Sequence, residues 1–118
     1  MIPLDGLDFL NLEPAEIQDP VVRQLLPQGE PVVGAFSNGF QGVVFTDKRM
    51  LLILTQRTPK GKNPEYVFLA FDKILAFCVN TPPTQAQNCR LEVLFPQLGT
   101  IRFWFDSQYQ VYTLCQYF

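Results

Sequence analysis

The sequence contains no histidine, and it has only three cysteines in 118 residues. Ten residues separate Cys78 from Cys89 and twenty-five separate Cys89 from Cys115, a spacing that fits neither a zinc pattern nor a disulfide framework. Tetrahedral zinc sites usually need histidine or paired cysteines. We therefore expect no metal site and no cofactor, and we expect three buried, reduced thiols of the kind found in the cytoplasm.

The sequence also lacks the motifs of common catalytic sites. It has no histidine to act as a base, no Gly-x-Ser-x-Gly motif and no glycine-rich phosphate loop, and its carboxylates are scattered. We predict no catalytic residue and a protein that is not an enzyme. An unrecognised enzyme is the third reading, after the two binding functions described below.

Clustered charge and long apolar runs are absent as well. Nine Lys and Arg against eleven Asp and Glu give a net charge of −2, and no three basic residues are consecutive, whereas nucleic acid attracts a basic stripe. No apolar run approaches the roughly twenty residues of a membrane helix. Residues 1–10 have no basic residue before their apolar ones, unlike a signal peptide. We expect no nucleic-acid partner, no transmembrane segment and a cytoplasmic location.

What the chain has is apolar and aromatic surface: 47% of its residues are apolar, and 11 Phe, 4 Tyr and 1 Trp are present. This composition predicts one packed domain, residues 1–118. Residues 39–54 read as two apolar strands that fold back at Thr46-Asp47-Lys48-Arg49. Asn38-Gly39 predicts a two-residue turn with positive φ at both positions. The other predicted strands are 31–36, 65–71, 73–80, 89–95 and 100–105.

The last two strands alternate apolar and polar residues, which predicts their register. Pairing apolar faces places Phe95 opposite Ile101 and Glu92 opposite Trp104. A helix over 106–118 follows, with Asp106 as N-cap. Residues 1–30 predict a short helical extension whose second helix begins at Asp19-Pro20. Residues 57–64 have the composition of a basic loop.

Several segments together resemble the bacterial pleckstrin-homology-like domains, over roughly residues 20 to 118. They are Leu25–Glu30, Val44–Arg49, Glu65–Val67, Phe71–Ile74 and Phe77–Val79. The resemblance implies a mainly β fold of two near-orthogonal sheets, here seven antiparallel strands over 31–105, capped by the helix at 106–118. It also implies cyclic homo-oligomers, and it transfers no catalytic residue.

The segments 50–54, 66–71 and 74–79 are apolar on both faces of the pleat, so their outer faces must be covered, either by the N-terminal helices or by another subunit. Met50, Leu52, Phe68 and Trp104 are the candidate interface residues. The predicted function is a non-enzymatic scaffolding module that acts through protein contacts and self-assembly as a homo-oligomer, with a ring as one form.

The alternative function is a peripheral lipid-binding or small-ligand-binding module. Lys60 and Lys62 are the candidate anion contacts, although a solvated loop is the simpler interpretation. Lys48 and Arg49 are read as a solvated turn that marks the fold. Phe40 and Trp104 are aromatic enough to hold a ligand, but packing is favoured for both.

Overall fold

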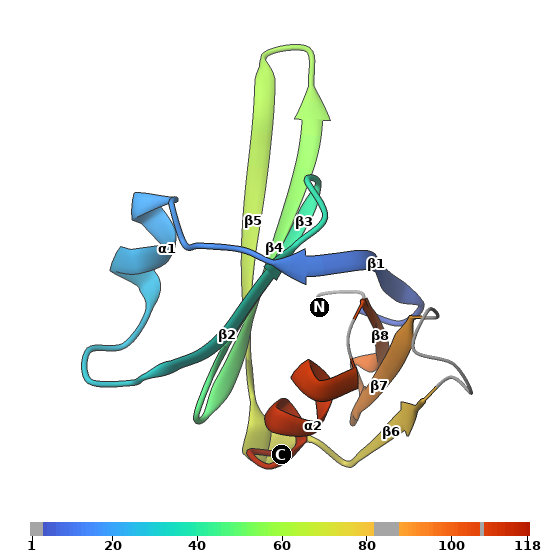
Figure 1. Ribbon diagram of the computed structural model, residues 1–118. Helices are drawn as coiled ribbons and strands as arrows, with labels where there is room; N and C mark the ends of the chain where they lie inside the picture. Colours follow the sequence, from blue (N-terminus) through green and yellow to red (C-terminus); the bar gives the residue numbers. More distant parts are fainter. Residues whose placement is uncertain (1–3, 82–87, 107) are drawn as a thin grey trace.

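The computed structural model describes residues 4–81, 88–106 and 108–118, without the side chains of residues 56–58, 62, 108 and 109 (Figure 1). Within them, eight strands lie in the order β5-β4-β3-β2-β1-β8-β7-β6, and a helix follows the last strand. This curled, mainly β sheet with a C-terminal helix confirms the predicted fold class. The elements are β1 (Leu7–Pro14), α1 (Pro20–Leu25), β2 (Val32–Ser37), β3 (Gln41–Thr46), β4 (Arg49–Thr58), β5 (Gly61–Ala70), the 3₁₀ helix η1 (Phe71–Lys73), β6 (Ala76–Asn80), β7 (Cys89–Phe95), β8 (Gly99–Phe105) and α2 (Gln108–Cys115).

The central hairpin of β3 and β4 forms as predicted. Phe45 lies opposite Met50, and the pairing continues to Gln41 and Leu54. Two residues, Asp47 and Lys48, connect the ends of the strands. Val43, Phe45, Met50 and Leu52 belong to the main core, which fills the concave side of the sheet. Val44 and Leu51 belong to a second cluster on the outer side. Both faces of this hairpin are therefore buried.

The first strand, β1, corrects the predicted helical extension over residues 1–30. β1 pairs in parallel with β8, with Leu7 opposite Ile101 and Phe9 opposite Phe103, and it pairs antiparallel with the end of β2. It thereby links β2–β5 to β6–β8 in one continuous order of eight strands, instead of the expected seven. The prolines favour a helical interpretation of this segment, but Leu7 and Phe9 alternate with polar Asp8, which is the pattern of a strand.

The second predicted N-terminal helix is present as α1. Asp19 is its N-cap, accepting a hydrogen bond from the Val21 amide at 2.9 Å, and Pro20 opens the helix. Only Val22 of α1 is fully buried, and it packs in the outer cluster with Val44 and Leu51. The N-terminal segment thus covers Leu51 on the outer face of β4.

Strands β7 and β8 keep the predicted faces but not the predicted register. Phe95 lies opposite Gly99, and Arg90, not Glu92, lies opposite Trp104, a shift of two residues. The connecting loop is shorter than expected because Gln97 and Gly99 both have positive φ, at 66° and 106°, which allows a tight three-residue turn. A shift of two preserves side-chain parity. The apolar face, Leu91, Val93, Phe95, Ile101, Phe103 and Phe105, is therefore still buried.

Two predicted turns also differ in detail. At the β2–β3 loop only Gly39 has positive φ, because the Asn38 side chain instead accepts from the amides of Phe40 and Gln41, at 2.9 and 2.8 Å. The predicted loop over 57–64 is a hairpin, in which β4 and β5 remain paired up to Thr58 and Gly61. Pro64 is tolerated there because β5 is an edge strand.

Helix α2 is shorter than the predicted 106–118, and it packs against β2, β7 and β8 (Figure 1). Val111 and Leu114 are buried in the main core. Beyond the helix, the Phe118 ring lies 5.0 Å from that of Phe71 and 5.3 Å from that of Phe77. The end of the chain thus closes one side of the core, as the capping prediction required.

Candidate interaction surfaces

For two of the four candidate residues, the prediction that they lie at an interface is wrong. Met50 and Leu52 have no exposed surface and point into the main core. On a strand that is apolar on both faces, the sequence does not distinguish the inner side from the outer side. The outward residue between them, Leu51, is covered by α1 and its neighbours.

The other two candidates are accessible but far apart in the sheet. Phe68 is 37% exposed on β5, at one edge of the sheet. Trp104 is half-buried on β8, with the Arg90 guanidinium 5.4 Å from its ring centroid. Four strands lie between β5 and β8 in the sheet order, so Phe68 and Trp104 do not form one patch.

Lys60 is exposed at the tip of the β4–β5 hairpin, and the side chain of Lys62 lies outside the described residues. An anion or lipid contact at this tip stays a prediction. At the other end of β4, Arg49 is not merely solvated, because its Nε lies 2.9 Å from Glu30 Oε1 in an ion pair.

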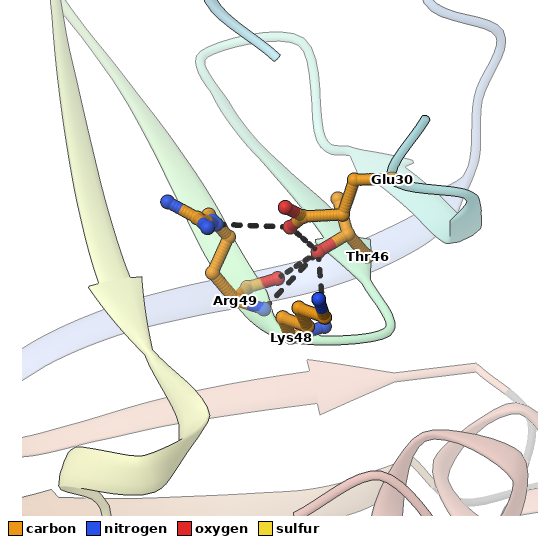
Figure 2. A network of polar contacts seen from close by, with 4 residues as sticks. All are labelled: Glu30, Thr46, Lys48 and Arg49. Carbon is orange, nitrogen blue, oxygen red and sulfur yellow. Dashed lines mark hydrogen bonds and ion pairs between the residues drawn. The ribbon is translucent and has the colours of Figure 1, made fainter. Parts of the chain in front are cut away.

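The β3–β4 turn is held by a polar network around Thr46 (Figure 2). The buried Thr46 hydroxyl donates to Glu30, and its oxygen accepts from the backbone amides of Lys48 and Arg49, at 3.2 and 3.1 Å. Glu30 and Thr46–Arg49 come from two of the segments that carried the family resemblance. The network gives these residues a shared structural role, because it joins Glu30, just before β2, to Thr46 and Arg49 at the β3–β4 turn.

The Glu30 network predicts a pH-dependent stability. Burial opposes ionisation of Glu30, but hydrogen bonds from Thr46 and Arg49 and the charges of Arg49 and Lys48 outweigh it and lower the pKa of Glu30 below its ordinary 4.5. The ionised network therefore stabilises the fold above pH 4.5, and this contribution is lost as the pH falls through the lower folded pKa. Glu30→Gln should reduce the free energy of unfolding by about 1 kcal/mol at pH 7.

The test is urea denaturation of both proteins between pH 7 and pH 3, with the difference between them shrinking below pH 4.5. Glu13→Gln, at an exposed carboxylate of β1, is the control, with an expected change within about 0.5 kcal/mol. A deficit for Glu30→Gln that stayed constant with pH would contradict the role of its charge.

Strand β6, at the opposite edge from β5, overlaps the segment 74–79, for which the sequence predicts a covered outer face. It nevertheless carries exposed apolar residues. Leu75 just before it is 67% exposed and Phe77 is 43% exposed. Cys78 is exposed too, which corrects the expectation that all three thiols are buried. The apolar run from Ile74 to Val79 was the available signal, but it did not show that β6 lies at an edge.

The other two cysteines fit the prediction of inert thiols. Cys89 is buried and Cys115 half-buried, and burial raises the pKa of Cys89. Burial, assisted by the neighbouring Cys89 thiol, raises the pKa of Cys115 to about 11. Both thiols are therefore protonated and unreactive at neutral pH.

Among the residues that the structure describes, no three His, Cys, Asp or Glu side chains are grouped so as to hold a metal ion. In the same part of the chain, neither helix has the length and apolar character needed to cross a bilayer.

Comparison with known proteins places this fold. A family model described as Bacterial PH domain matches residues 8–118. The crystal structure of a DUF1696 family protein with a pleckstrin-homology domain, from Shewanella loihica PV-4, is similar, with a TM-score of 0.62 and 24% identity over 78% of this chain and 80% of that chain. At this identity the likeness concerns the fold. No curated protein matches the chain.

Proposed function

Because the chain belongs to the bacterial PH domain family, a family of unknown function, as the Val44–Arg49 segment indicated, we propose that it is a non-enzymatic binding and scaffolding module that acts by self-assembly and protein contacts. The observation that supports this most is the open sheet. In the described part of the chain, β5 and β6 stand at opposite ends of the strand order, each beside one neighbour.

An open edge is a template for pairing with another chain unless it is blunted or covered. The β6 edge adds apolar side chains to that template, because Leu75 and Phe77 are exposed there. At the other edge, Phe68 of β5 is partly exposed. The two edges therefore offer both backbone hydrogen-bonding groups and apolar surface to a second copy.

Because the two edges are different strands of one molecule, joining β6 of one copy to β5 of the next is a heterologous contact. Such a contact closes into a ring or grows into a filament. A stable interface needs about 800 Å² from each partner, more than these few side chains provide, so the strand edge itself has to take part. We propose a closed ring as the soluble form, in the cytoplasm, where free cysteines such as the exposed Cys78 stay reduced.

Size-exclusion chromatography with light scattering at low micromolar protein tests self-assembly. We expect the mass of the wild-type protein to be at least twice the 13.5 kDa of the monomer. Leu75→Asp should have the mass of the monomer, because a carboxylate at the edge is costly to bury. Leu10→Asp, at a residue that is 51% exposed on the central strand β1, should leave the mass unchanged. A monodisperse wild-type monomer would rule out self-assembly, and an unaltered assembly of Leu75→Asp would rule out the β6 edge.

A further inference from the structure

A cavity of about 250 Å³ lies on the outer face of the sheet, bounded by the segment that precedes α1, the β2–β3 loop and strand β4. Its lining includes three apolar residues of α1, β3 and β4, namely Val22, Val44 and Ile53. Gly42 adds no side chain to this lining, and a Cβ there would lie 3.3 Å from Ile53 Cδ1. The space is therefore a hollow in the outer cluster, and its lining includes no residue of β5 or β6.

The wall formed by residues 15–19 is held in place from three sides. The Ala15 amide donates to the Ala35 carbonyl of β2 at 2.9 Å. The Arg23 guanidinium donates to the Ile17 carbonyl through Nε at 3.1 Å and Nη2 at 2.7 Å. Asp19 accepts from the Tyr66 hydroxyl of β5 at 2.7 Å. A wall that is already ordered reduces the entropy that a ligand must lose on binding.

The charge of the lining has one sign. Glu16 and Asp19 contribute carboxylates, and no Lys or Arg is among the sixteen lining residues. Arg23, on the helix behind the wall, is engaged by the Ile17 carbonyl. Phe40 of the β2–β3 loop, 63% exposed, adds aromatic surface to the lining. This combination favours an apolar group that carries a positive charge beside it, and it disfavours phosphate.

The volume limits the size of the occupant. Sites for drug-sized ligands and cofactors usually span about 300–1,000 Å³, so 250 Å³ suits one or two side chains. We propose that this cavity binds an extended segment of a partner protein, which seats an apolar side chain against Val22, Val44 and Ile53 and directs an adjacent Lys or Arg toward Glu16 and Asp19. No residue of β5 or β6 is among the sixteen lining residues, so the site does not require a free sheet edge and does not depend on self-assembly.

The test uses the isotope-labelled full chain and three synthetic octapeptides of Gly and Ser whose central pair is Leu-Lys, Ser-Lys or Leu-Glu. We expect the Leu-Lys peptide to shift the amide resonances of residues 16–18, 39–42 and 53–55. The other two peptides should bind at least about tenfold more weakly, because the Ser-Lys peptide lacks the leucine to be buried and the Leu-Glu peptide lacks the matching charge. Equal shifts from all three peptides, or shifts confined to other residues, would overturn the proposal.

A pair of charge reversals locates the site. Glu16→Lys alters an exposed lining residue and should weaken the Leu-Lys peptide about fivefold or more while leaving the fold intact. Glu13→Lys makes the same change in net charge at an exposed position outside the lining, and it should have less than a twofold effect. Equal losses for the two variants, or stronger shifts with vesicles of anionic phospholipid than with the Leu-Lys peptide, would refute a basic peptide as the occupant.

Discussion

Replacing Leu114 with alanine is expected to lower the free energy of unfolding by about 2–5 kcal/mol. Leu114 is buried on α2 and belongs to the main core. It packs over Gly34 of β2, where an added Cβ would lie 3.5 Å from Leu114 Cδ2. Because glycine has no side chain to move into the vacated space, the cavity should persist, and the loss should lie in the upper part of this range.

Urea denaturation followed by tryptophan fluorescence measures the effect. Tyr112→Ala, at an exposed position on the same helix, shortens a large side chain without opening the core, and its expected cost is at most about 1 kcal/mol. Equal shifts of the two denaturation midpoints would mean that α2 does not close the core as described.

The sequence predicted those elements whose evidence is local. The β3–β4 hairpin could be predicted because two apolar runs flank a short polar turn. The apolar faces of β7 and β8 could be read because strand side chains alternate with a period of two. Their register could not, because it depends on the positive φ of Gln97 and Gly99, which only glycine makes visible in a sequence.

Pairings between distant segments were not predictable, even where alternating residues indicate a strand, as at β1. β1 is stabilised by β8, with Leu7 opposite Ile101, and nothing near Leu7 indicates that partner. The prediction of the interface residues was wrong for a related reason. Met50 and Leu52 point into the main core because α1 covers the other side of the strand, at Leu51. Local pattern identifies a two-faced apolar strand but not which element covers each face.

The candidate sites show the same limit. Glu30 and Thr46 lie in segments that resemble the family, yet their hydrogen bond joins residues far apart in sequence. The cavity beside α1 combines residues from three stretches of the chain, within 15–22, 35–44 and 53–55, so no motif in any one of them marks it. Leu75 and Phe77 were visible as apolar residues, but their exposure follows from the place of β6 at the sheet edge.

Substitution of Gly99 by alanine is expected to destabilise the protein by about 2–6 kcal/mol, because two costs of about 1–3 kcal/mol each add. Gly99 has φ of 106°, a region that other residues rarely adopt. An added Cβ would also lie 2.5 Å from Asp5 Cβ and 2.6 Å from Asp5 Cα, and backbone cannot yield as a flexible side chain can. Asp5 is itself fixed, since its Oδ1 accepts from the Thr100 amide at 3.2 Å.

Relief of that clash requires residues 4–6 to move away from β8, which would break the hydrogen bond from the Gly6 amide to the Thr100 carbonyl and expose the buried Leu4. Gly61→Ala separates the two costs. Gly61 has φ of 125° but no heavy atom of the described residues within 4 Å of an added Cβ, so it should show the conformational cost alone, about 1–3 kcal/mol. If urea denaturation gave Gly99→Ala a loss no greater than that of Gly61→Ala, the N-terminal segment would not lie against the β7–β8 turn as described.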